Sequence, residues 1–107
     1  MVNVKRNIIK ELKKRKVVQH RADVNIGKRG LHPGVIEEIR RRLEIEGAVK
    51  IRILKNARSI VKDEDIRRMA ESIGAIIADW RGYTYVLVKR EISGIKVDKE
   101  VQRRGSG

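Results

Sequence analysis

The order in which helical and strand periodicities follow one another constrains the fold of this chain more than any other feature. Apolar residues recur at helical spacing in three segments, and they alternate with polar residues or run together in four shorter ones. The predicted helices cover residues 4–16, 33–46 and 64–73. The predicted strands cover residues 22–26, 48–54, 75–80 and 83–89. The resulting order is α-β-α-β-α-β-β.

This order predicts one compact domain of the α/β (α+β) class. A strand, a helix and a second strand in succession favour a parallel crossover, whereas the two-residue gap Arg81-Gly82 favours an antiparallel hairpin at the end. We therefore expect a four-stranded mixed sheet packed with three helices. The 107 residues suit a single domain, which we place at residues 1–90. The polar residues 91–107 are predicted to form a C-terminal tail.

Single residues mark the predicted helix ends. Pro33 suits the first position of the second helix, where no backbone N–H is needed, and His32 before it is predicted to be a capping or loop residue. Asp63 is the predicted N-cap of the third helix. Gly47 and Gly74 are natural stops for the second and third helices.

The chain is strongly and unevenly basic. It has 27 Lys and Arg against 14 Asp and Glu, for a formal net charge of +13. Residues 1–30 hold ten of the basic residues and two of the acidic ones, so under a third of the chain carries a net charge of +8. Localised positive charge of this size favours a polyanionic partner, and above all a nucleic acid.

A glycine-framed basic turn lies inside this charged segment, at Gly27-Lys28-Arg29-Gly30. Glycine has no Cβ, so its backbone can approach a phosphate closely or adopt a positive φ without strain. The helix that begins at Pro33 would aim free N–H groups and a partial positive charge toward the turn. The pattern therefore predicts a phosphate-binding loop, although an ordinary strand-to-helix connection often has the same residues.

The first predicted helix carries a second group of candidate contacts. Its cations off the apolar stripe are Lys5, Arg6, Lys10, Lys13 and Lys14. Glu11 is the single acid in residues 4–16, whereas a purely solvated face would mix both signs. The composition of this helix therefore favours contact with phosphates.

Arg40, in the second predicted helix, is a further candidate for nucleic-acid contact. Arg41 and Arg42 each have a glutamate four residues earlier, at Glu37 and Glu38, and are expected to pair with it. Arg40 has no acid at that spacing.

The residues needed for other functions are missing or scattered. The chain has no Cys, and His20 and His32 are too far apart in sequence to suggest a metal site. Asp79 is an isolated acid without a nucleophile–base set. We therefore expect no enzyme activity, no metal, no cofactor and no small-molecule substrate. No apolar run approaches the ~20 residues of a membrane span and no signal peptide is evident, which favours a cytoplasmic protein without a membrane partner.

The three aromatic residues, Trp80, Tyr83 and Tyr85, flank the predicted hairpin. Domains that stack bases on their sheets have a signature rich in aromatic residues that is missing here. These three side chains are therefore predicted to pack or to lie at a rim, and recognition is expected to depend on phosphates and on the shape of a structured RNA.

The chain also carries an ordered set of short matches to a known family. They are Ile26-Gly27-Lys28-Arg29-Gly30-Leu31, Gly34-Val35, Val49-Lys50-Ile51, Gly74-Ala75, and Gly82 followed by Tyr83-Thr84-Tyr85-Val86-Leu87. With the order of elements, they resemble the CRM (chloroplast RNA splicing and ribosome maturation) domain of the YhbY-type proteins, in a stand-alone, archaeal-like form. The resemblance implies a fold like that of the C-terminal domain of translation initiation factor three. It also implies binding to ribosomal RNA or structured intron RNA, and it likens the glycine turn to the phosphate-gripping loop of KH domains.

Together these observations predict a non-catalytic protein that binds structured RNA through its basic first helix and its glycine turn. Ribosomal RNA or a ribosomal subunit is the expected partner, and we expect a monomer off the RNA. A permanent structural protein of a ribosomal subunit has the same size and charge. A DNA-coating chromatin protein is the alternative from another class, although no apolar wedge for the minor groove is evident.

Overall fold

The computed structural model describes residues 4–90, with side chains from Asn7 onward, so the predicted tail lies outside the described residues. All three predicted helices and all four predicted strands are present. The elements are α1 (Val4–Val17), β1 (Val24–Ile26), α2 (Pro33–Glu46), β2 (Ala48–Ile53), the short 3-10 helix η1 (Lys55–Ala57), α3 (Asp63–Ser72), β3 (Ala75–Arg81) and β4 (Thr84–Lys89). The prediction of fold class is confirmed.

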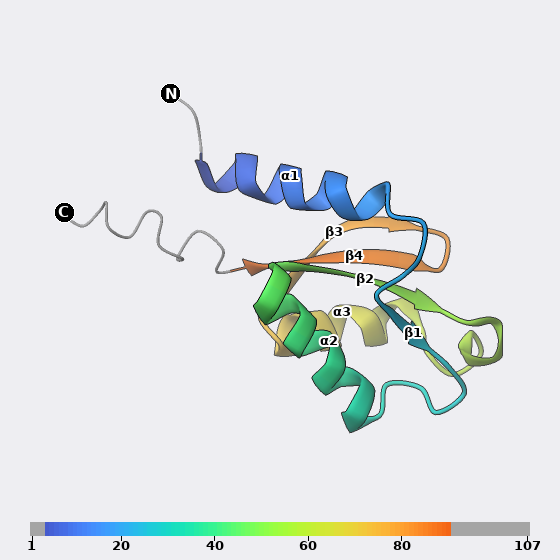
Figure 1. Cartoon of the computed structure of the whole chain (residues 1–107). Coiled ribbons are helices and arrows are strands. Elements are labelled where there is room, and N and C mark those ends of the chain that lie inside the picture. Colours follow the sequence, from blue (N-terminus) through green and yellow to red (C-terminus); the bar gives the residue numbers. More distant parts are fainter. Residues whose placement is uncertain (1–3, 91–107) are drawn as a thin grey trace.

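The four strands form one mixed sheet in the order β1-β2-β4-β3. β1 pairs with β2 in parallel, with Val24 opposite Ile51, and α2 makes the crossover between them. β4 lies antiparallel to both β2 and β3. The last of the described strands, β4, is therefore inside the sheet, and the short β1 and the longer β3 are its edges (Figure 1).

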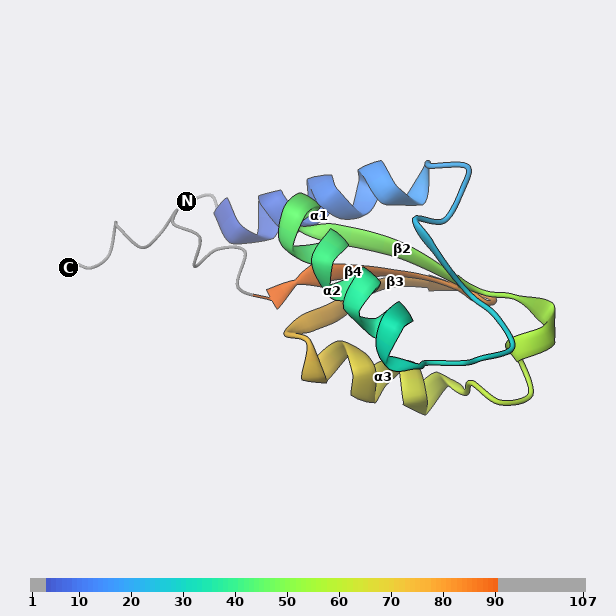
Figure 2. The ribbon, with the colours of Figure 1, turned by 60° about the horizontal axis from the view of Figure 1, so that its bottom comes forward.

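Helices cover both faces of the sheet, with α1 on one face and α2 and α3 side by side on the other (Figures 1 and 2). The larger core lies between the sheet and the α2–α3 pair. Its fully buried side chains include Ile26, Ile39, Leu43, Ile51, Ile66 and Leu87. Burial of these side chains in one contiguous cluster is the main source of stability.

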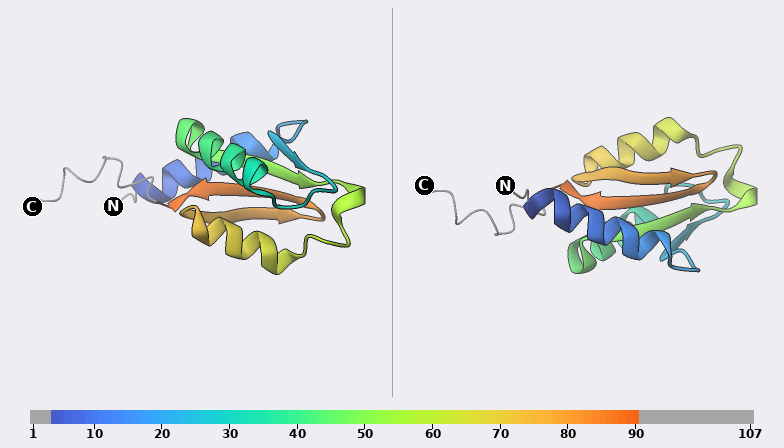
Figure 3. Two further views of the ribbon diagram at one scale, coloured as in Figure 1. Left: turned by 90° about the horizontal axis from the view of Figure 1, so that it is seen from below. Right: turned by 90° about the horizontal axis from the view of Figure 1, so that it is seen from above.

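α1 packs on the opposite face over a smaller core. That core consists of the buried Ala48, Val86 and Val88, against which partly buried side chains of α1 pack, namely Ile8, Ile9, Leu12 and Val17. α1 ends at Val17, and the strands extend beyond it toward the β3–β4 turn (Figure 3). Part of this sheet face is therefore not covered by a helix.

A buried charge cluster fixes α1 against the rest of the domain. Position 16 lies on the same side of the helix as the apolar stripe, so the charged Lys16 is only 3% exposed. Its Nζ donates hydrogen bonds to Asp23 Oδ2 at 2.8 Å and to Glu46 Oε1 at 2.6 Å. Burial opposes ionisation of Asp23, but hydrogen bonds from Lys16 and from the backbone of Lys50 outweigh it, so the pKa of Asp23 is below its ordinary value.

The hairpin lies slightly differently from the prediction. β3 runs to Arg81 and β4 begins at Thr84, so Gly82 and Tyr83 form the turn. The register of β3 against β4 shifts between Ile77 and Asp79, as at a β-bulge. Before this shift the side chains alternate between the two faces of the sheet. Unbroken alternation would place Asp79 on the face that α3 covers, but after the shift Trp80 lies on that face and Asp79 lies on the other.

The helix starts confirm one predicted cap and correct another. His32 is the N-cap of α2, and its Nδ1 accepts a hydrogen bond from the Gly34 N–H at 3.1 Å. Asp63 is not the cap of α3: the N-cap is Lys62, and Asp65 accepts from its N–H at 2.9 Å. Asp63 is already the first residue of the helix, and its carboxylate accepts hydrogen bonds from the Tyr85 hydroxyl at 3.0 Å and from Arg67 Nε at 2.7 Å.

Candidate nucleic-acid interface

The glycine turn joins the end of β1 to the start of α2. Its chain reverses tightly, because the Gly30 N–H donates to the Gly27 carbonyl at 2.8 Å. Gly30 is buried with a φ of +66°, and a Cβ there would lie 3.5 Å from Ile60 Cδ1 and 3.7 Å from Val61 Cγ2. Glycine at position 30 is therefore required by the fold itself, because other residues rarely adopt that backbone conformation.

The other residues of the turn face the solvent. A Cβ at Gly27 would meet no atom within 4 Å, and Gly27 is not among the described glycines with positive φ. Lys28 and Arg29 are exposed, and neither has an ion-pair partner within residues 7–90. Their backbone N–H groups make no hydrogen bond to any described residue. The outer side of the turn thus presents two cations and two free donors.

The N-terminus of α2 differs from the expectation of free N–H groups. Pro33 has no N–H, the Gly34 N–H donates to the His32 ring, and those of Val35 and Ile36 donate to the His32 carbonyl at 3.1 Å. The cap therefore uses the donors that were predicted to face a phosphate. Donors for an anion at this site come from the turn rather than from the helix.

α1 carries its predicted cations on a different side of the molecule. Lys10 and Lys14 are exposed and Lys13 is half-buried, and none has an ion-pair partner in the described part of the chain. The side chains of Lys5 and Arg6 lie outside the described side chains. α1 and the glycine turn lie on opposite sides of the sheet, so these two predicted groups do not form one patch (Figure 1).

Arg40 forms an ion pair, although the sequence analysis selected it because it has no acid four residues earlier. Its Nη2 lies 2.6 Å from Glu37 Oε2 and its Nε donates to Glu37 Oε1 at 3.1 Å. The hydrogen bond from Arg40 lowers the pKa of Glu37 below its ordinary value. The acid is three residues earlier rather than four, and Arg41 pairs with Glu38 instead of Glu37. A contact between Arg40 and a nucleic acid stays a prediction.

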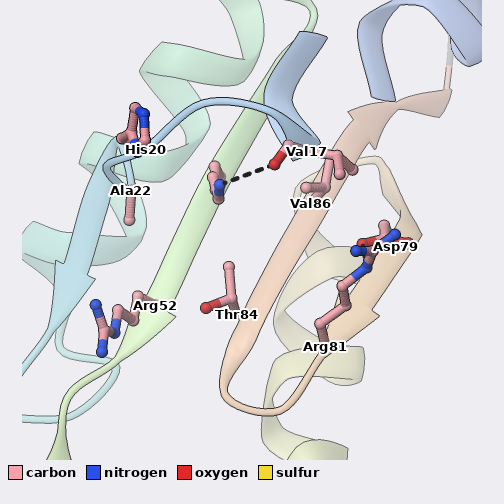
Figure 4. Close-up of a pocket in the computed structure, with 9 residues that line it drawn as sticks. Val17, His20, Ala22, Arg52, Asp79, Arg81, Thr84 and Val86 are labelled. Atoms are coloured by element: carbon pink, nitrogen blue, oxygen red, sulfur yellow. Dashed lines mark hydrogen bonds and ion pairs between the residues drawn. The ribbon is translucent and has the colours of Figure 1, made fainter. Parts of the chain in front are cut away.

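The sequence did not indicate a basic hollow of about 210 Å³ on the sheet face that α1 leaves open (Figure 4). Arg52, Thr84 and Arg81 are successive partners across β2, β4 and β3, and all three line it. Arg52 is exposed with no ion-pair partner in residues 7–90, whereas Arg81 lies 3.2 Å from Asp79. The available signal was the alternation of 48–53, which puts Arg52 on the face opposite Ile51.

A comparison with known families identifies the domain type. Residues 5–89 match the model of the CRS1/YhbY (CRM) domain. The chain belongs to the CRM family. A solved structure of similar fold is the solution structure of a hypothetical protein from Staphylococcus aureus, described as a candidate RNA-binding protein. It has 20% sequence identity and a TM-score of 0.53, over 83% of this chain and 88% of that one. No curated protein matches the chain significantly.

Membership of the CRM family supports RNA as the partner of this domain, since CRM domains are RNA-binding modules. Within the described residues, no group of three or more metal-ligating side chains comes together. No helix in that part of the chain is long and apolar enough to cross a membrane. The candidate interface of this CRM domain is therefore a set of unpaired cations and free backbone donors on the glycine turn, α1 and the open sheet face.

Proposed function

We propose that this CRM domain is a non-catalytic binder of structured RNA, with ribosomal RNA or a ribosomal precursor as its partner. The observation that carries the proposal is the outer side of the glycine turn. Lys28 and Arg29 have neither ion-pair nor backbone hydrogen-bond partners in the described chain. Two cations and two free N–H groups at one point suit a phosphate, whose oxygens accept several donors at once.

Gly27 adds a second argument for a phosphate at the turn. The backbone conformation at Gly27 does not require glycine, and a Cβ there would point into open space. A side chain would, however, occupy the space through which an RNA backbone reaches the N–H groups of Lys28 and Arg29. The fold does not require glycine at this position, but the close approach of a ligand would.

The open sheet face offers a path between the two predicted groups of cations. Arg52 lies near the end of β2, next to the end of the parallel β1 from which the glycine turn begins. The hollow that Arg52 lines also includes Val17, the last residue of α1. An RNA backbone that follows α1 would therefore cross Arg52 before it reaches the end of the molecule that holds the turn.

This arrangement favours phosphate contacts over base reading for most of the affinity. Each neutralised phosphate releases counterions, so binding should be steep in salt concentration. The same surface would serve a resident ribosomal protein, and sedimentation with subunits after a high-salt wash separates that role from a transient one. Crosslinking in cells, followed by recovery of the bound RNA, identifies the partner.

The test of the turn is a carboxylate at Gly27. Gly27→Asp should fold normally and bind a fluorescent stem-loop RNA about tenfold more weakly, because the new anion repels the phosphate and blocks its approach. Ile45→Asp is the matched control, since Ile45 is 70% exposed at the far end of α2 and the charge change is the same. A folded Gly27→Asp that binds as tightly as Ile45→Asp removes the turn from the interface.

A further inference from the structure

The exposed aromatic residues Trp80 and Tyr83 lie at the β3–β4 turn. This turn is at the end of the sheet where β1 leads into the glycine turn, because Thr84 at the start of β4 pairs with Arg52 of β2, and Ile53 of β2 pairs with Ile26 of β1. Trp80 is 54% exposed and Tyr83 is 47% exposed, which is more than packing residues show. They line a hollow of about 420 Å³, within the size range of ligand pockets. Its wall also includes Ile53, Arg58, Val61, Lys62, Asp63, Gly82 and Tyr85.

The protein holds both rings in place on one side. Trp80 stacks on the buried Tyr85, with ring centroids 6.2 Å apart and an interplanar angle of 9°, and its Nε1 donates to the Gly82 carbonyl at 2.9 Å. The guanidinium of Arg58 lies 4.0 Å from the centroid of the Tyr83 ring. Rings fixed in this way need little further ordering before they stack on a ligand.

Tyr85, beneath Trp80, is itself anchored. Its hydroxyl donates to Asp63 at 3.0 Å, and burial together with this hydrogen bond raises the pKa of Tyr85 to about 12. The β-bulge between Ile77 and Asp79 then turns Trp80 to the same face of the sheet. A backbone irregularity that aims an exposed aromatic ring at a hollow is a common device next to functional sites.

The aromatic hollow adjoins a second hollow beside the glycine turn. Val61 lines both hollows, and the wall of the second includes Arg29 and Gly30. The lining of the aromatic hollow has two cations, Arg58 and Lys62, and one acid, Asp63, which pairs with Arg67 outside the hollow. Neither Arg58 nor Lys62 has an ion-pair partner in the described residues. A polyanion held at the turn would therefore be drawn toward the rings.

We propose that the hollow between Trp80 and Tyr83 receives an unpaired base of the RNA whose phosphates the glycine turn holds. This inference rests on the proposed function, and it specifies that the structured RNA has a bulge, loop or single-stranded end beside the contacted backbone. Unpaired bases stack on aromatic rings and on arginine planes, and both groups line this hollow. An apolar protein segment would fit the rings but not the cations around them.

Trp80 gives the test a direct reporter, because it is the only tryptophan in the chain. The probes are a single-stranded oligoadenylate and a fully paired RNA duplex of the same length. The oligoadenylate should quench the emission of Trp80 as it binds, whereas the duplex should bind without quenching, since its bases are already stacked. Binding of both RNAs without quenching, or equal quenching by both, overturns the inference.

Substitutions at Tyr83 provide the second measurement. Tyr83→Ala should weaken binding of the oligoadenylate about tenfold and leave duplex binding within about twofold, whereas Tyr83→Phe should restore it, since the ring is retained. Equal affinities of Tyr83→Ala and wild type for the oligoadenylate overturn the base site and leave the proposed function standing. If neither RNA binds wild type at low salt, the proposed function fails as well.

Discussion

Removal of the two cations of the glycine turn gives the most quantitative test of how this domain binds RNA. Lys28→Ala combined with Arg29→Ala deletes two exposed side chains that pair with no described residue. Surface changes of this kind usually alter the free energy of unfolding by less than about 0.5 kcal/mol. The backbone donors of the turn remain, so the experiment isolates the charge.

The expected effect follows from counterion release. Each phosphate contact contributes about 0.7–0.9 to the slope of log affinity against log salt, so the loss of two contacts lowers the slope by about 1.6. At 0.1 M salt the same term amounts to about 1.6 logarithmic units, or roughly a 40-fold loss of affinity. The term vanishes near 1 M salt, where wild type and variant should converge.

Fluorescence anisotropy with one labelled stem-loop RNA, at several salt concentrations, measures both quantities. The matched control is Arg41→Ala combined with Lys89→Ala, which removes the same net charge from residues paired with Glu38 and Glu44. This control should keep the wild-type slope. A turn variant with an unchanged slope, or a control variant with the same loss, would refute the assignment of phosphate contacts to the turn.

Two further predictions concern α1. Replacement of Lys10, Lys13 and Lys14 by Glu should weaken RNA binding at least about tenfold in the same assay. The melting curve should stay near that of wild type, because none of the three side chains is fully buried. Normal affinity of this variant would mean that the face of α1 is merely solvated. Asp23→Asn should lower the free energy of unfolding at pH 7 by about 2–3 kcal/mol in urea, because Lys16 is left buried with Glu46 as its remaining carboxylate. Folding lowers the pKa of Asp23, so the ionised carboxylate stabilises the fold fully at a pH above its ordinary pKa of 3.8. This stabilisation is lost as the pH falls through the lower pKa of the folded state. The stabilities of wild type and Asp23→Asn should therefore converge in strong acid.

Periodicity predicted the elements of this fold because each stripe reports a local requirement for burial. Ile39 and Leu43 face the core from α2, and Ile51 and Ile53 face it from β2, as their spacings require. The order of the strands in the sheet depends on contacts between distant segments, since β4 could join the sheet at more than one edge. The crossover and hairpin rules predict a mixed sheet but not the position of β4 between β2 and β3.

The candidate site was predicted in part, and its gaps have physical causes. The sequence pointed to the turn but could not separate Gly30, which the fold requires, from Gly27, which it does not. The sequence does not indicate Arg52 as a site residue, because its exposure depends on where α1 ends on the sheet. Trp80 is predicted only to pack or to lie at a rim, because the face on which it lies depends on a register shift that the sequence does not mark.

The two edges of the sheet bear on how this domain behaves at high local concentration. β1 has only three residues, and β3 is interrupted by the shift between Ile77 and Asp79. A strand from another molecule needs a regular row of free backbone groups, and neither edge offers a long one. Many copies of this domain gathered along one RNA would therefore resist edge-to-edge pairing, a common route from crowding to aggregation among sheet proteins.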